Sequence, residues 1–140
     1  MLLNSLEFIK VFETDYLTLR YSAKEKLIWN EWRGDIPSPQ LREAMLYASN
    51  FILEQNIELI LADFTCMCAP TMQDQVWIAK HTAELLQHSR LRRVANLLAQ
   101  DIFRQRAIEN IYEKASQTPM PCETRDFVSE EDALIWLLSD

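Results

Sequence analysis

The fold is decided by residues 58–64, which read Glu-Leu-Ile-Leu-Ala-Asp-Phe. The run is short and almost continuously apolar, a pattern typical of a strand that is covered on both faces. Residues 93–99 form a second run of this kind. Between the two, Thr71 and Asp74 have the spacing of a capping box at the start of a helix. A strand, a helix and a strand in this order predict a parallel pair joined by a crossover.

The N-terminal part of the sequence predicts an antiparallel hairpin. Residues 16–21 and 27–32 are rich in aromatic and aliphatic strand formers, and the polar segment 22–26 separates them. Residues 8–12 are expected to add a further strand before this hairpin. Together with the later parallel strands, the hairpin predicts a mixed sheet.

Four helices are expected along the chain. Ser38 is a suitable N-cap for the first helix, and Pro39 suits its first helical position. The second helix follows Thr71, the third opens at Asp101, and the fourth is capped by Ser129. The second helix is expected to bury its apolar residues, which are Met72, Val76, Ala79, Ala83 and Leu86.

These elements predict one α/β domain over residues 1–140. Its mixed β-sheet starts as an antiparallel N-terminal hairpin, carries about four helices packed on it, and receives a last short strand from residues 122–128. The chain has a single glycine, Gly34, so its tight turns are expected to use Asn, Asp, Ser and Pro.

The charge balance and the cysteine count exclude several classes of protein. The 140 residues include 14 basic and 21 acidic side chains, a formal net charge of −7. Such a surface repels phosphates, so no nucleic-acid partner is expected. No run of about 18 apolar residues is free of charge, so no membrane insertion is expected. Three cysteines cannot all pair in disulfides, which favours reduced thiols and a cytoplasmic location.

The order of elements resembles the STAS-like fold, named after sulfate transporters and anti-sigma-factor antagonists. The resemblance rests on the strand at residues 60–65, the loop that leads to Thr71, and the C-terminal stretch 126–137, which reads Asp-Phe-Val-Ser-Glu-Glu-Asp-Ala-Leu-Ile-Trp-Leu. Residues 32–34 and 74–77 resemble an uncharacterised bacterial group with this fold. Members of the fold commonly act by docking to partners, so the resemblance implies a regulatory role.

The resemblance also implies a candidate modification site at Thr71. In anti-sigma-factor antagonists, the loop after the matching strand delivers a phosphorylatable Ser or Thr to the start of the next helix. The family motif is of the type Asp-Ser-Ser/Thr-Gly, whereas residues 68–73 read Cys-Ala-Pro-Thr-Met-Gln and lack its acidic residue and its glycine. Thr71 is therefore either a phosphorylation or anion site, or an ordinary helix N-cap.

Two further groups of residues are candidates for binding. Ligands of open α/β sheets bind outside the carboxyl ends of the parallel strands, where the sequence places Asp63, Phe64, Gln100 and Asp101. Asp101 also suits a plain N-cap. Trp29 and Trp32 lie three apart on one strand and so point to opposite faces. One is expected to pack under helices, and the other is either covered or exposed as a partner surface.

The remaining candidates lack the spacing that their chemistry needs. Zinc sites use four ligands, commonly with Cys-x2–4-Cys spacing, which the Cys66, Cys68 and His81 set does not provide, even with His88 and Cys122 added. No metal, cofactor or catalytic residue is predicted. An anion patch or a solvated, paired surface would explain the arginines, which are Arg90, Arg92, Arg93, Arg104 and Arg106.

Two functions fit these observations. The first is a non-enzymatic regulatory or protein-interaction domain whose partner is another protein or a second copy of the chain, since the edge of the hairpin would otherwise be exposed. The alternative is a carrier of a small apolar ligand or lipid, held in a crevice at the carboxyl ends of the central strands near Phe64, Met67 and Met72. An enzyme is the least supported, because no phosphate loop, nucleophile elbow or zinc helix is present.

Overall fold

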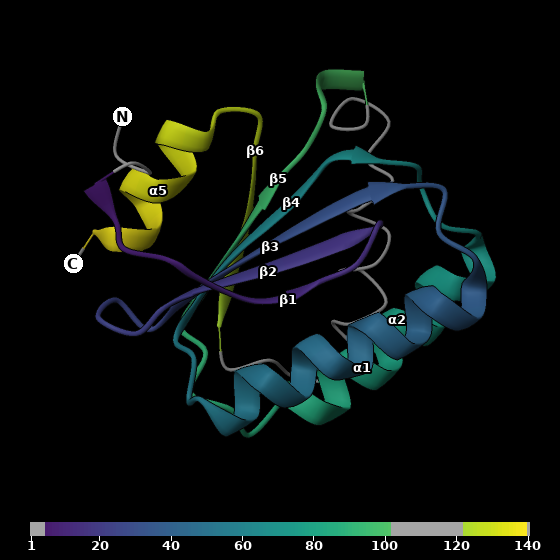
Figure 1. The fold of residues 1–140 in the computed structure, drawn as a ribbon, viewed down its shortest axis with the longest axis horizontal. Helices are drawn as coiled ribbons and strands as arrows, with labels where there is room; N and C mark the ends of the chain where they lie inside the picture. Colours follow the sequence, from purple (N-terminus) through teal and green to yellow (C-terminus); the bar gives the residue numbers. More distant parts are fainter. Residues whose placement is uncertain (1–4, 102–121, 140) are drawn as a thin grey trace.

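The computed structural model describes residues 5–101 and 122–139, which form a mixed sheet with helices on both faces (Figure 1). The strands are β1 (Ile9–Glu13), β2 (Leu17–Ser22), β3 (Leu27–Gly34), β4 (Leu59–Met67), β5 (Arg93–Leu97) and β6 (Glu123–Phe127), and the helices are α1 (Ser38–Glu54), α2 (Met72–Leu86) and α5 (Glu130–Leu138).

The six strands lie in the sheet in the order in which they occur in the chain. β1 and β2 are antiparallel, as are β2 and β3, so the predicted hairpin and its additional strand are confirmed. β3, β4, β5 and β6 are parallel neighbours. The decisive run at residues 58–64 is therefore a central strand with a parallel partner on each side, which is why it reads as almost uniformly apolar.

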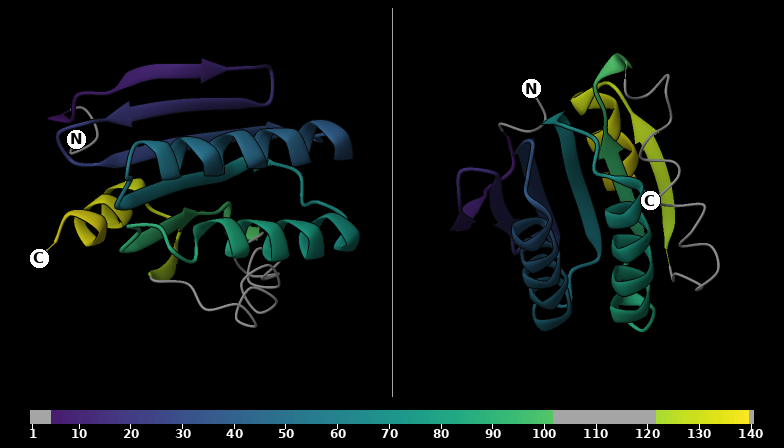
Figure 2. Two further views of the ribbon diagram at one scale, coloured as in Figure 1. Left: turned by 90° about the horizontal axis from the view of Figure 1, so that it is seen from below. Right: turned by 90° about the vertical axis from the view of Figure 1, so that its right-hand side faces the viewer.

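The two faces of the sheet are covered by different helices. Helices α1 and α2 lie side by side on one face, and α5 lies on the other (Figures 1 and 2). Successive residues of β4 alternate between them: Ile60 packs with the α1 and α2 side, and Leu61 packs with α5. α5 contributes Ala133, Leu134 and Leu137, none of which is exposed.

The expectation of about four helices is not supported. Three helices are present in residues 5–101 and 122–139. The helix that we expected after Asp101 would occupy residues 102–121, which lie outside the described part of the chain. Among the described helices, none is long and apolar enough to cross a membrane.

The expected N-cap of α1 is wrong. Pro37 occupies the N-cap position, and no side chain caps the helix. The Ser38 hydroxyl instead donates a hydrogen bond to the Asp74 carboxylate in α2, with an Oγ to Oδ1 distance of 2.5 Å. The hydroxyl thus joins two helices rather than starting one.

The expected buried face of α2 is also wrong over its first two turns. Met72 and Val76 are 54% and 44% exposed, whereas Asp74 and Gln75 are buried. Each residue of an α-helix is turned by roughly 100° from the last, so the bonds from α1 that turn Asp74 inward also turn Met72 and Val76 outward. Ala79, Ala83 and Leu86 are buried as expected.

In the described part of the chain, the tight turns use three residues with positive φ. Gly34 ends β3 at φ 80°, a conformation that L side chains rarely adopt. Asn56 follows the end of α1 at φ 52°, where Asn takes the place of the glycine usual after a helix. Lys26, at φ 55°, completes the β2–β3 turn, which we had not expected of a lysine.

Helix α5 is capped at its start and bonded to the sheet at its end. The Ser129 side chain accepts a hydrogen bond from the Asp132 amide at 3.2 Å, so the predicted cap is confirmed. At the other end, Arg93 Nη1 donates to the carbonyl oxygens of Trp136 and Ser139 at 2.6 and 2.8 Å. A cation at this place satisfies carbonyls that the helix leaves free and interacts well with its dipole.

We predict that Arg93→Gln destabilises the protein by about 1–2 kcal/mol in urea denaturation, because it leaves the last carbonyls of α5 without their charged donor. Arg92→Gln is the matched control. The Arg92 side chain is 54% exposed and paired with Glu58, so its loss should cost about 0.5 kcal/mol or less. Equal effects of the two variants would contradict the role assigned to Arg93.

Candidate functional site

The candidate site is a groove at the carboxyl ends of β3 and β4. The groove has a volume of about 340 Å³ and lies between the loop from β3 to α1 and the loop from β4 to α2. The backbone of the two loops is joined where the Cys68 amide donates to the Gly34 carbonyl at 3.0 Å. Residues from both loops and both following helices form its walls, among them Asp35, Ser38, Met67, Cys68, Thr71 and Asp74.

Asp74 is the polar centre of this groove. One of its carboxylate oxygens accepts hydrogen bonds from Ser38 Oγ and from Arg42 Nε at 3.1 Å. The bond from Ser38 is the largest cause that lowers the pKa of Asp74 from its ordinary value of 3.8, and Arg42 lowers it further. The carboxylate is buried, so it is a charged link between α1 and α2.

Thr71 is the N-cap of α2, as predicted. Its hydroxyl oxygen accepts a hydrogen bond from the Asp74 amide at 3.2 Å. The other half of a capping box is absent from the described contacts, because the Asp74 side chain is turned to α1 instead. Thr71 is exposed to solvent, and its modification remains a prediction.

The loop before α2 is held from inside the molecule by Gln75. Its side-chain amide donates to the Pro70 carbonyl at 2.9 Å, and the residue is 5% exposed. The Thr71 end of the groove is therefore fixed by two buried side chains, Asp74 and Gln75. The sequence pattern did not identify either as buried, because both residue types usually lie on the surface.

The four residues expected to form a crevice are not brought together in this groove. Asp63 and Phe64 are neighbours on a strand and so point to opposite faces. Asp63 accepts hydrogen bonds from the Thr65 amide and hydroxyl at 2.9 and 2.6 Å. Phe64 packs against the core under α1 and α2. Gln100 and Asp101 are exposed, and none of the four lines the groove.

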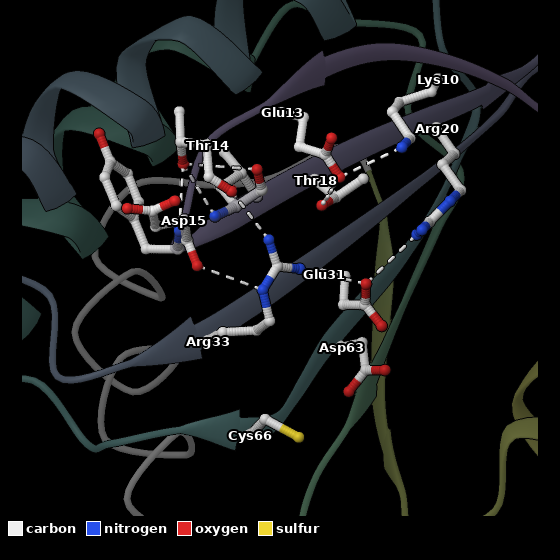
Figure 3. Close-up of polar contacts among 12 residues, drawn as sticks. Lys10, Glu13, Thr14, Asp15, Thr18, Arg20, Glu31, Arg33, Asp63 and Cys66 are labelled. Carbon is white, nitrogen blue, oxygen red and sulfur yellow. Dashed lines mark hydrogen bonds and ion pairs between the residues drawn. The ribbon is translucent and has the colours of Figure 1, made fainter.

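The face of the sheet formed by β1, β2 and β3 on the α5 side carries a network of paired charges (Figure 3). Glu31 accepts from Arg20 at 3.3 Å and from Arg33 at 3.2 Å. Arg33 also donates to the carbonyl oxygens of Thr14 and Asp15, at 2.9 and 3.3 Å, in the turn between β1 and β2. These contacts join β2 and β3 to each other and to the turn between β1 and β2.

Several carboxylates approach one another where α5 begins. Burial is the largest cause that raises the pKa of Glu130 above its ordinary value of 4.5, and the charges of Asp63, Glu131 and Glu31 raise it further. Sequence reasoning missed this group, because Glu31, Asp63 and Glu130 are far apart in the chain and only the sheet places them near one another.

The two tryptophans of β3 point to opposite faces, as predicted. Trp32 is 2% exposed in the core under α1 and α2, so it is the tryptophan that packs under the helices and it is no candidate for a partner surface. Trp29 is half-buried on the other face, where the Phe8 ring lies edge-on at 5.5 Å and the Arg20 guanidinium lies 4.4 Å from the indole centroid.

The residues considered for a metal site or an anion patch make local contacts or are exposed in the described part of the chain. Within residues 5–101 and 122–139, no group of three or more His, Cys, Asp or Glu side chains could hold a metal ion. The His81 ring stacks on Trp77 with centroids 4.3 Å apart, and burial raises the pKa of the Cys122 thiol. Cys66, Cys68, His88 and Arg90 are exposed, and Arg104 and Arg106 lie outside the described residues.

A second cavity, of about 140 Å³, lies between the sheet and helices α1 and α2. Strands β3, β4 and β5 form one wall through Trp32, Ile60 and Val94, and the helices form the other through Ala48 and Ala83. The sequence did not predict it, since most of the lining residues also suit a packed core.

We predict that Asp74→Asn costs about 1–2 kcal/mol of stability at pH 7, because two donors lose a charged acceptor. The folded-state pKa of Asp74 is lowered, so its stabilisation is present above the ordinary value of 3.8 and is lost as the pH falls through the folded-state pKa. Thermal unfolding of the variant should therefore depend less on pH than that of the wild type as the pH falls below 3.8.

Asp132→Asn is the matched control for this variant. Asp132 is the third residue of α5, its amide donates to a Ser N-cap as the Asp74 amide donates to Thr71, and its side chain is exposed. Its substitution should change stability by about 0.5 kcal/mol or less. The same loss in both variants would remove the special role of the link between α1 and α2.

We predict that Glu130→Gln stabilises the protein at pH 7 by about 0.5 kcal/mol, because it removes a charge that its neighbours repel. A carboxyl whose pKa is raised by folding destabilises the fold only when it is ionised. The gain should therefore shrink as the pH falls through the raised folded-state pKa, and little of it should remain below 4.5, the ordinary value. Glu84→Gln, at an exposed site on α2, should show no gain in the same thermal unfolding series.

Comparisons with known proteins show the fold. No protein-family model matches the chain, and no curated protein matches it. The structure is similar to that of an uncharacterised protein of the DUF3478 family from Shewanella loihica, which has a SpoIIAA-like fold. The TM-score is 0.56 at 13% sequence identity, and the match covers 94% of this chain and 92% of that chain. The SpoIIAA-like fold is the STAS-like fold that the order of elements resembles.

Proposed function

We propose that this chain is a non-enzymatic regulatory domain of the cytoplasm that binds another protein through the outer face of α2. We call Thr71, Met72 and Val76 the α2 docking face. The observation that carries the proposal is the exposure of Met72 and Val76, at 54% and 44%. The two side chains are four residues apart and therefore adjacent on the helix surface.

The surroundings of the α2 docking face suit a binding surface. Methionine is flexible and polarisable, so it adapts to a partner's side chains. The backbone beneath is fixed by the Asp74 bonds to Ser38 and Arg42. A surface that is already ordered loses less entropy on binding, which favours affinity.

A non-enzymatic role agrees with the contacts of side chains that could otherwise act as acids or bases. The Asp63 and Asp74 carboxylates accept hydrogen bonds from neighbouring side chains. The His81 ring nitrogen Nδ1 lies 2.9 Å from the Trp77 carbonyl oxygen of its own helix. In each case the group stabilises local structure, and a catalytic site would need such groups to converge on a reacting atom.

The proposal gives Thr71 a regulatory role. A phosphate on its hydroxyl would lie at the N-terminus of α2, where backbone amides and the helix dipole favour negative charge. It would also place two negative charges beside Met72, and an apolar contact there would weaken. Phosphorylation at Thr71 would then control docking.

The other surfaces considered are less suitable for docking. The free edge of β1 would allow a homodimer, but it carries an irregular register between Lys10 and Phe12, and bulges and lysines at an edge oppose strand pairing. Trp29 is covered in part by Phe8 and Arg20. We therefore place the main contact on α2, with a second copy of the chain as a less favoured partner.

We predict that a photo-crosslinking amino acid at Val76, introduced in the protein's native cells, gives a covalent adduct with one protein. The same amino acid at Glu84 is the matched control, because Glu84 is exposed near the other end of α2. If charge at this position controls docking, Thr71→Asp should reduce the yield of the adduct at Val76 by about tenfold. A tenfold loss of affinity corresponds to about 1.4 kcal/mol of binding free energy.

The outcome is read by mass spectrometry of the adduct. One partner at Val76 and none at Glu84 agrees with the proposal, and an adduct between two copies of the chain would identify the partner as the chain itself. Equal labelling at Val76 and Glu84, or no adduct at either, would count against the α2 docking face.

The second candidate function, a carrier of a small apolar ligand, is favoured by the cavity of about 140 Å³ under α1 and α2. This cavity is not the crevice expected at the strand ends, although Phe64 lines it. A cavity of roughly 150 Å³ holds benzene, so the ligand of this proposal is a small molecule and not a lipid.

A further inference from the structure

We infer that the cavity under α1 and α2 is a binding site for a small, uncharged, mostly apolar molecule that carries one hydrogen-bond acceptor. The inference rests on the second candidate function and names the chemistry of its ligand. It is carried by two buried polar side chains, Ser49 and Asn30, which line the cavity from opposite walls.

Ser49 presents a hydroxyl to the cavity from α1. The residue is 3% exposed. In residues 5–101 and 122–139, no group donates a hydrogen bond to its side chain or accepts one from it. The hydroxyl keeps contact with the space inside the cavity, so an acceptor bound there could take a hydrogen bond from it.

Asn30 presents donor hydrogens to the cavity from β3. Its side-chain oxygen accepts a hydrogen bond from Trp32 Nε1 at 3.2 Å. An indole nitrogen only donates, so the amide must turn its oxygen to Trp32, and its nitrogen keeps two hydrogens to donate. In the described residues no acceptor is bonded to that nitrogen, and Asn30 is 6% exposed. Each of the two polar groups can therefore donate to an acceptor in the cavity.

The rest of the lining defines what the molecule cannot be. The described lining residues include no Lys, Arg, His, Asp or Glu, so a charged ligand would be buried without a counter-charge, at high cost. Most of the wall is aliphatic or aromatic, including Trp32, Ile52, Ile60 and Phe64. This lining excludes carboxylates and phosphates, and it fits a small ketone, ether or alcohol.

The experiment compares three probes of nearly the same shape on the wild-type protein. Acetophenone has a carbonyl acceptor, isopropylbenzene replaces the acceptor with carbon, and benzoate replaces it with a charged group. We expect acetophenone to bind with a Kd on the order of 1 mM or tighter, isopropylbenzene about fivefold more weakly, and benzoate not at all. Titrations are followed by NMR of isoleucine methyl groups.

The isoleucines report where the probe binds. Ile52, Ile60 and Ile78 line the cavity, so their methyl signals should shift on addition of acetophenone. Ile9 and Ile135 are 65% and 56% exposed on the surface, and their signals should not move. Shifts confined to the surface residues would place the probe elsewhere and overturn the inference.

Two serine variants test the polar contact. Ser49→Ala should weaken acetophenone binding about fivefold and leave isopropylbenzene binding unchanged, because only the carbonyl needs the donor. Ser22→Ala is the matched control, since Ser22 is 1% exposed and does not line the cavity. It should bind acetophenone as the wild type does.

Three results would overturn the inference. The first is no binding of any probe, which would mean that the cavity admits only water. The second is equal affinity for acetophenone and isopropylbenzene, and the third is equal behaviour of the two serine variants. If isopropylbenzene binds as well as acetophenone, an apolar carrier function survives and only the ligand chemistry fails. Crosslinking at Val76 tests protein docking separately.

Discussion

The arrangement of the helical layer depends on one buried carboxylate. Asp74 accepts hydrogen bonds from Ser38 and Arg42 of α1, and this link fixes the rotation of α2 about its own axis. The backbone amide of the same residue donates to Thr71 and so starts the helix. The Asp74 carboxylate thus determines which face of α2 meets α1, and the Thr71 side chain caps the start of the helix. A charged group is suited to this role, because a buried charge without its partners is far more costly than a misplaced apolar side chain.

The rotation of α2 has consequences for both proposed functions. On the outer side it leaves Met72 and Val76 in solvent, where they form the α2 docking face. On the inner side it places small residues, among them Ala83, against the sheet, and the space above them contributes to the cavity that Ser49 and Asn30 line. The two sites are thus on opposite sides of one helix. A molecule in the cavity and a partner on the outer face would both contact an element held by the same ion pair.

Much of the fold could be predicted because its signals are local. The apolar run of β4, the polar turn of the hairpin and the caps at Thr71 and Ser129 each depend on a few neighbouring residues. The candidate sites were harder to predict. Alternation along β4 already implies that Asp63 and Phe64 cannot share a crevice. The network around Glu31 and the carboxylates near Glu130 had no such signal, since they come from segments that only the sheet brings together.

The sequence by itself determined the order of the strands and helices, the parallel centre of the sheet and the antiparallel hairpin, because hydrophobic period and turn chemistry act within a few residues. Only the tertiary structure decided which face of α2 is buried. The apolar pattern of that helix favoured Met72 and Val76, and the contacts with Ser38 and Arg42 favoured Asp74. Those partners lie more than thirty positions away in the chain, so no local pattern contains them. The groove and the cavity were decided in the same way, by the packing of distant segments.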